Sequence, residues 1–164
     1  MLLGILSDSH DNAPSLAGAV ALLQQRGAEF FIHCGDVCSP SMLDHLAGLP
    51  SAFVWGNCDA DRLGLQRYGQ SLNVQCYGRV GELTLAEKRI AFTHGDDALL
   101  RDRLLADQQH DYVLQGHTHI QRDIYVGKTR HINPGALQRA AVKSVALLDL
   151  TKNILEFLTI EVRR

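Results

Sequence analysis

Residues 2–12, LLGILSDSHDN, combine a short apolar run with a polar ending that contains Asp8 and His10. We interpret Leu2 to Leu6 as a buried strand, because the run is short and almost entirely apolar. A helix is expected directly afterwards, because Asn12 offers a capping side chain and a proline two residues later suits the first helical turn. The stretch therefore predicts a strand that delivers polar side chains to the start of a helix.

The same pattern repeats along the next forty residues. A glycine at position 27 suits the end of the first helix, and a second strand is expected over Glu29 to Cys34. Ser39-Pro40 opens another short helix, and Ala52 to Trp55 reads as a third strand. Strand, helix, strand, helix, strand is the order of a parallel sheet with helical crossovers.

The second half is predicted to consist mainly of strands. A helix should begin at Asp96-Asp97, and residues 59–78 read as a loop with a short helix. Turns are expected near Lys88, at Val126-Gly127-Lys128 and at Thr151-Lys152-Asn153. The expected strands are Val80 to Glu87, Arg89 to Thr93, Tyr112 to Gln115, His119 to Val126, Thr129 to Ile132, Val145 to Leu150 and Ile154 to Val162. The fold class that follows is α/β, with two packed mixed β-sheets flanked by helices in a single domain over residues 1–164.

Composition narrows the classes of protein. A chain of 164 residues with 46% hydrophobic and 21% charged residues has ordinary globular composition and can bury a core. A formal net charge of -2 without a run of Lys or Arg gives no evidence for nucleic-acid binding, and Arg163-Arg164 reads as a solvated tail. The apolar start at Met1 is too short to span a membrane and lacks a basic region, so no membrane association and a cytoplasmic location are expected.

The four cysteines are expected to be reduced thiols, since no export signal is recognised. They are Cys34, Cys38, Cys58 and Cys76. A structural zinc site remains an alternative, but Cys34 and Cys38 lack the second pair of cysteines that such a site normally has.

Five apolar runs end in residues that bind metal ions. These endings are Asp8-Ser9-His10, Gly35-Asp36, Gly56-Asn57, Thr93-His94-Gly95 and Gly116-His117-Thr118-His119. Ligands of open α/β sheets bind at the carboxyl ends of the strands, where loops can aim side chains at one point. Carboxylate and imidazole suit manganese, iron, zinc or nickel better than calcium. The pattern predicts a site for two metal ions that acts on a phosphate ester.

The spacing within two of these endings supports convergence. Alternate positions of an extended chain point the same way, so Asp8 should lie beside His10, and His117 beside His119. Each residue also has an ordinary explanation, such as a helix cap for Asp8 or a turn for Asp36. All of these explanations would have to hold together to remove the site. His33, His45, His110 and His131 have no partners in the pattern, with His33 expected on a strand near the site and His45 on a helix surface.

The ordered set of motifs, with Cys58-Asp59 after Asn57 and with Asn133-Pro134-Gly135 further on, resembles the calcineurin-like metallophosphoesterase superfamily. The similarity is closest to its compact bacterial and archaeal phosphodiesterases. The resemblance implies a four-layer α-β-β-α sandwich and a dinuclear-metal-dependent phosphodiesterase acting on a small phosphate ester. A phosphomonoesterase at the same site and a non-catalytic protein-binding scaffold on the same fold remain alternatives, and a homo-oligomer remains open.

The resemblance also implies roles for individual residues. Asp36 would bridge the two ions, and Asp36, Asn57 and His94 would be catalytic. Hydroxide held between the ions would attack the phosphate, with Asn12 and Cys58 contacting the substrate. The ions would be Mn²⁺, with Ni²⁺, Fe²⁺ or Zn²⁺ as alternatives. The first ion would take Asp8, His10, Asp36 and His119, and the second Asp36, Asn57, His94 and His117.

Three positions depart from the common pattern of this family. Cys58 stands where many members have a histidine thought to protonate the leaving group, although the compact phosphodiesterases often share the cysteine. Asp11 occupies a position where glycine is common, and Asp96 follows His94-Gly95 where many members carry another histidine. None of these changes removes an expected metal ligand.

Overall fold

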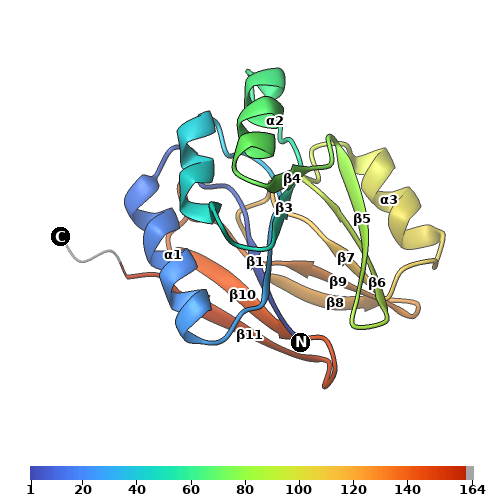
Figure 1. The fold of residues 1–164 in the computed structure, drawn as a ribbon. Helices are drawn as coiled ribbons and strands as arrows, with labels where there is room; N and C mark the ends of the chain where they lie inside the picture. The colour runs from blue at the N-terminus through green and yellow to red at the C-terminus, as the bar shows by residue number, and fades with distance from the viewer. Residues whose placement is uncertain (162–164) are drawn as a thin grey trace.

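Two β-sheets lie face to face between layers of helix in the computed structural model, which describes residues 1–161 (Figure 1). The first sheet has six strands in the order β11-β10-β1-β2-β3-β4, and the second has five in the order β5-β6-β7-β9-β8. The first comprises β1 (Leu2–Leu6), β2 (Phe30–His33), β3 (Ser51–Phe53), β4 (Val74–Cys76), β10 (Ser144–Asp149) and β11 (Ile154–Thr159). The second comprises β5 (Val80–Leu85), β6 (Lys88–Thr93), β7 (Tyr112–Leu114), β8 (Arg122–Val126) and β9 (Thr129–Asn133).

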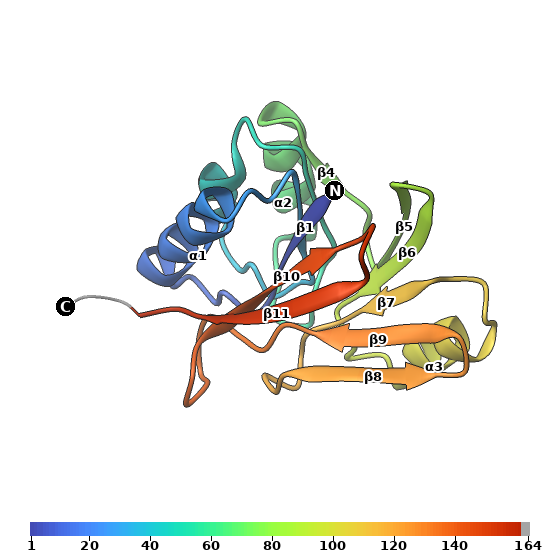
Figure 2. The same cartoon turned by 90° about the horizontal axis from the view of Figure 1, so that it is seen from below.

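Helices cover the outer faces of both sheets (Figures 1 and 2). Three pack against the six-stranded sheet, namely α1 (Ala13–Gln25), the 3₁₀ helix η1 (Pro40–Leu46) and α2 (Arg62–Ser71). On the other side, α3 (Ala98–Ala106) packs its Leu104 and Leu105 against the five-stranded sheet. The predicted order of layers, helix, sheet, sheet and helix, is therefore confirmed.

Strand β1 shows how alternation builds two separate cores. Leu3 and Ile5 point into the apolar layer between the two sheets, whereas Leu6 points to the layer under the helices. Gly4 shares the helix side, and a Cβ there would lie only 3.0 Å from the side chain of Leu23. The absence of a side chain at Gly4 thus lets α1 lie close against the sheet.

The parallel strands bring the polar endings to the same edge of each sheet. β1, β2, β3 and β4 are parallel, as are β6, β7 and β9. Each expected ligand follows the carboxyl end of a parallel strand: Asp8 with His10 after β1, Asp36 after β2, Asn57 after β3, His94 after β6, and His117 with His119 after β7.

Three expected element boundaries were wrong. Residues 59–78 hold the ten-residue helix α2, capped by Asp61, and also the strand β4, which the sequence did not predict. The turn expected near Lys88 lies at Ala86 and Glu87, which have φ of 47° and 61°. Such left-handed residues suit a two-residue hairpin turn whose twist matches the strands.

The last boundary that differs concerns the chain around His119. A strand was expected from His119 onward, but β8 begins only at Arg122 because His119 itself has a left-handed backbone with φ of 57°. At the other end, β11 stops at Thr159. Val162 and the expected solvated tail, Arg163-Arg164, lie outside the described residues.

The cysteines agree with the expectation of reduced thiols, because all four are free in the structure. No zinc-like cluster joins Cys34 to Cys38 within residues 1–161. Among the described residues there is also no helix of the length and hydropathy that a bilayer span requires.

His131 on β9 should make the protein sensitive to acid. Burial lowers the pKa of His131 to about 4, with further lowering by the charges of Arg122 and Arg101. Below about pH 6.5 this histidine therefore binds a proton in the unfolded chain but not in the folded chain. The free energy of unfolding consequently falls as the pH drops from 6.5 toward 4. We expect His131→Leu to reduce this loss by about 2 kcal/mol at pH 4.5.

Urea unfolding at pH 7 and pH 4.5, with chelator present throughout, measures this difference. Buried His33, whose pKa burial lowers to about 3, titrates in the same direction and should keep part of the acid sensitivity. His45→Leu, at a half-exposed position of η1, is the control and should keep the full wild-type loss. A His131→Leu protein that loses as much stability in acid as wild type would contradict the assignment.

Candidate metal centre

Asp8 and Asp36 form the buried centre of the site. Their exposed fractions are 0% and 2%, and each uses one carboxylate oxygen to accept a hydrogen bond from a backbone amide. The amide of His117 donates to Oδ2 of Asp8 at 3.0 Å, and that of Cys58 donates to Oδ1 of Asp36 at 2.8 Å. The other oxygen of Asp8, Oδ1, is buried and accepts no hydrogen bond. A buried oxygen left in this way needs a positively charged partner.

Two imidazoles surround the free oxygen of Asp8. Its Oδ1 lies 3.1 Å from Nε2 of His119 and 3.8 Å from Nε2 of His10. These two nitrogens are 3.4 Å apart, and Nε2 of His10 lies 3.5 Å from Oδ2 of Asp36. Atoms that bind one ion at about 2.1 Å lie about 3.0–3.5 Å from one another, so these spacings fit a shared cation.

A second set of side chains lies on the other side of Asp36. Oδ2 of Asp36 is 3.3 Å from Nε2 of His94, which in turn is 3.1 Å from Oδ1 of Asn57. The ring of His117 lies 5.1 Å from that of His94, centroid to centroid, and is exposed. Oδ2 of Asp36 thus stands between the imidazoles of His10 and His94. The structure brings together all seven side chains that the sequence singled out as metal ligands.

Backbone carbonyls orient two of the imidazoles. Nδ1 of buried His94 lies 2.8 Å from the carbonyl oxygen of Cys34, and Nδ1 of His119 lies 3.3 Å from that of Arg139. A donor hydrogen at Nδ1 leaves the lone pair on Nε2, the nitrogen that faces the carboxylates. These contacts prepare both rings to act as metal ligands.

The carboxylates make this position favourable for positive charge. Burial by itself lowers the pKa of His94, but the hydrogen bond and charge of Asp36, with the charge of Asp8, raise it to about 8. Burial likewise opposes ionisation of Asp36, yet His94 and the amide of Cys58 hold the pKa of this carboxyl well below its ordinary value. Asp36 is therefore a carboxylate at any physiological pH.

The physical reason predicted for the two Asp-x-His and His-x-His spacings was wrong. The chain is not extended there, because five of the seven residues have left-handed backbones. Turns place the side chains instead, as shown by the amide of His10, which donates to the carbonyl of Asp36 at 3.0 Å. The φ values are 54° at Asp8, 40° at His10, 57° at Asp36, 66° at His117 and 57° at His119. Such clustering of unfavourable backbone is typical of functional sites.

Asn12 and Cys58, the two residues predicted to contact substrate, differ from each other in their surroundings. Asn12 caps α1 by accepting from the amide of Ser15 at 3.2 Å, and its amide donates to Oε1 of Gln138 at 2.9 Å. Both ends of the Asn12 side chain are thus engaged within the protein. The thiol of Cys58 lies beside His10 and Asp36, close enough to share a cation with them.

The departures from the family pattern have distinct structural consequences. Asp11 also has a left-handed backbone, with φ of 58°, which accounts for the glycine that is common at this position. Its side chain compensates by accepting from the amide of Ser39 at 2.8 Å. Asp96 is exposed after the turn at Gly95.

Two residues that support the site had no predicted role. Asp59 is 2% exposed and accepts from the amides of Asp36 at 3.0 Å, Cys38 at 2.7 Å and Gly56 at 2.6 Å. It therefore ties the loop after β2 to the loop after β3. The only signal in the sequence was that Asp59 closes the motif that begins at Gly56.

Asn133 stabilises the loop after β7, which contains His117 and His119. Its amide donates to the carbonyl of Gly116 at 2.7 Å and to Oγ1 of Thr118 at 3.1 Å. Fully buried at the end of β9, it holds the turn that presents His117 and His119. The sequence marked Asn133 only through the resemblance.

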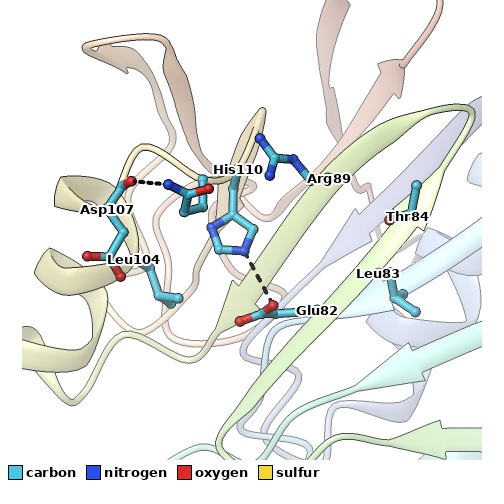
Figure 3. A pocket seen from close by; sticks show the side chains of 8 residues that line it. Glu82, Leu83, Thr84, Arg89, Leu104, Asp107 and His110 are labelled. Carbon is cyan, nitrogen blue, oxygen red and sulfur yellow. Dashed lines mark hydrogen bonds and ion pairs between the residues drawn. The ribbon is translucent and has the colours of Figure 1, made fainter.

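Elsewhere in residues 1–161, titratable side chains do not converge in this way. His33 lies on β2 near the site, as predicted, with Nε2 3.1 Å from Oγ of Ser9. Away from the cluster, a cavity of about 460 Å³ opens beside α3, where Nε2 of His110 pairs with Glu82 at 3.6 Å (Figure 3). Arg89 and Asp107 project from its other walls, and no third ligand joins His110 and Glu82 among the described residues.

Comparison with known proteins places the chain among phosphoesterases. The model of the calcineurin-like phosphoesterase superfamily domain matches residues 1–153. A phosphodiesterase of Methanocaldococcus jannaschii is 26% identical over 157 residues, which cover 93% of this chain and 95% of that protein. A probable metallophosphoesterase of the same organism is 31% identical over 166 residues, covering 92% of this chain and 76% of that protein.

The fold agrees with this assignment. The solved structure of an archaeal phosphodiesterase superposes with a TM-score of 0.90 at 24% sequence identity, covering 98% of this chain and 100% of that one. At this identity the likeness shows the fold, while the family model and the sequence relatives carry the membership. The chain belongs to the calcineurin-like phosphoesterase superfamily.

Proposed function

We propose that this protein is a phosphodiesterase that depends on two divalent metal ions. One observation carries the proposal: Oδ2 of Asp36 lies between Nε2 of His10, at 3.5 Å, and Nε2 of His94, at 3.3 Å. A carboxylate oxygen shared by two sets of imidazole ligands is the arrangement expected of a bridge between two cations. The family and the phosphodiesterases among its relatives support the same reaction class.

The two ligand sets follow from these spacings. Asp8, His10 and His119 would hold the first ion, and Asn57, His94 and His117 the second, with Asp36 common to both. Carboxylate, amide and imidazole donors suit Mn²⁺, with Ni²⁺, Fe²⁺ and Zn²⁺ as further candidates. The buried Oδ1 of Asp8, which accepts no hydrogen bond, fits this role because a cation would satisfy it.

Bound ions of this kind supply a water of lowered pKa as the nucleophile and neutralise charge on the phosphoryl group. The chain's own residues keep the geometry rigid. Backbone amides clamp one oxygen each of Asp8 and Asp36, and carbonyls fix the rings of His94 and His119. Ligands that cannot rotate away lower the reorganisation needed when the phosphate arrives.

Cys58 affects the charge of the site. Burial raises the pKa of its thiol, and the hydrogen bond and charge of Asp36 raise it further. In the metal-free protein the sulfur therefore keeps its proton at neutral pH. A thiol at this position is consistent with esters whose leaving group needs little help from a proton donor.

Metal removal gives the direct test of this function. As purified or after reconstitution with Mn²⁺, the protein should hold two metal ions per chain and hydrolyse bis(4-nitrophenyl) phosphate. Chelation with EDTA should lower the rate by at least about 10³-fold, because the nucleophile loses its activation. Elemental analysis by inductively coupled plasma mass spectrometry, with release of 4-nitrophenolate, measures both quantities.

The same preparation separates the alternatives. Readdition of Mn²⁺ to the chelated protein should restore the rate, whereas Mn²⁺ without protein provides the blank. Faster turnover of 4-nitrophenyl phosphate than of the diester would instead indicate a phosphomonoesterase. Two bound ions with no hydrolysis of either ester would contradict the enzymatic function and favour a binding scaffold.

A further inference from the structure

The loop between β9 and β10 carries an arginine to the edge of the metal cluster. The amides of Leu137 and Gln138 donate to the carbonyl oxygen of Asp8 at 3.3 and 3.1 Å. The carbonyl oxygen of the next residue, Arg139, lies 3.3 Å from Nδ1 of His119. Three consecutive loop residues are thus bonded to two candidate ligands. These bonds hold Arg139 beside the first ion position, with a left-handed turn at φ of 55°.

The guanidinium of Arg139 is available to an anion. Within residues 1–161 no carboxylate lies at ion-pair distance from it, whereas four other arginines have acidic partners: Arg26, Arg79, Arg101 and Arg130. Arg139 is itself exposed and lines the same cavity as His119.

A cavity of about 720 Å³ is bordered by His119 and Arg139 and reaches as far as Thr159. Its walls combine apolar residues, alanines at 140 and 141 with the exposed side chains of Ile120 and Val142, with uncharged polar residues such as Gln121 and Ser144. Ile120 and Val142 are 69% and 58% exposed, which is unusual for large apolar residues beside a polar site. Apart from the imidazole of His119, Arg139 is the one ionisable side chain in this lining.

We propose that Arg139 pairs with the phosphate of a diester and that the adjoining cavity receives an uncharged, apolar ester group of that substrate. The inference rests on the function proposed above and names its substrate class. A phosphodiester carries one negative charge, and a guanidinium binds phosphate oxygens through directed hydrogen bonds. A second phosphate in the cavity would meet no second cation, whereas an apolar group would cover Ile120 and Val142.

Binding of two unreactive diesters tests both halves of this proposal. Diphenyl phosphate and diethyl phosphate have the same charge and differ in their ester groups. On zinc-loaded protein, ligand-observed NMR should show Arg139→Gln weakening both ligands about 10- to 100-fold, as expected for loss of a charged hydrogen bond. Arg139→Lys should recover part of this affinity, and metal content should stay at the wild-type value in both variants.

The cavity is tested with the Ile120→Ser/Val142→Ser double variant. It should weaken diphenyl phosphate about tenfold and leave diethyl phosphate unchanged, because only the larger ester group reaches the apolar walls. Arg122→Gln, at an exposed position on β8, is the matched control and should bind both ligands as wild type does. Equal weakening of both ligands in the double variant would overturn the assignment of the cavity.

The outcomes separate this inference from the proposed function. Wild-type affinity in Arg139→Gln at full metal content would overturn the role of Arg139, and so would failure of the wild-type protein to bind diphenyl phosphate. Hydrolysis of diesters by wild type would still stand in that case. Conversely, a protein that binds the diesters through Arg139 but hydrolyses no ester would contradict the proposed function alone.

Discussion

Asp36→Asn should lower kcat/KM for bis(4-nitrophenyl) phosphate by about 10³-fold or more, because the charge between the two ions is lost. The substitution keeps the size of the side chain and an oxygen that can accept from the amide of Cys58. The fold should therefore survive, as judged by circular dichroism and urea unfolding. Metal content should fall from two ions toward one or none, since both ligand sets share Asp36.

The control for this variant is Asp44→Asn. Asp44 is exposed on η1 and accepts a hydrogen bond from the hydroxyl of Tyr68, which an asparagine oxygen can also accept. It should keep wild-type activity and metal content. An Asp36→Asn protein with two bound ions and unchanged turnover would refute the bridging role.

Asp59→Ala should lower the free energy of unfolding of the metal-free protein by about 3–5 kcal/mol. Three backbone amides, those of Asp36, Cys38 and Gly56, would lose the acceptor that they share. The loops after β2 and β3 would then separate, and metal affinity should fall although Asp59 contacts no ion position. Urea unfolding in the presence of chelator isolates the effect on the fold.

Asp61→Ala provides the comparison within the same loop. Asp61 is exposed and caps α2 by accepting from the amide of Gly64 at 2.9 Å, so its loss should cost only about 1 kcal/mol. If Asp59→Ala is no more destabilising than Asp61→Ala, the network around Asp59 does not support the site as described.

The sequence predicted the layers of the fold and the members of the candidate site for the same physical reason. Short apolar runs such as Leu2 to Leu6 have one plausible structure, and parallel strands must end at a common edge. Strand β4 was missed because Val74–Cys76 has only three residues and one of its side chains is exposed. Such a strand is defined by pairing with β3, which no local pattern reports.

The backbone of the site was also beyond local reasoning. Asp-x-His reads equally well as an extended chain or as a turn, and only contacts from other loops decide between them. At His10, the hydrogen bond from its amide to the carbonyl of Asp36 fixes the turn. Likewise, nothing near Asp59 in the sequence indicates that three amides from two loops converge on it.

The left-handed residues at the site have a thermodynamic consequence for the whole protein. Each non-glycine residue in this conformation costs on the order of 1 kcal/mol, and the cost is met during folding, before any cation binds. Because metal binding then relieves no backbone strain, the metal-free and metal-loaded sites should have nearly the same backbone conformation. The stability of the fold and the affinity for the ions are consequently coupled, because the same folding free energy holds the ligand backbone in its left-handed conformation.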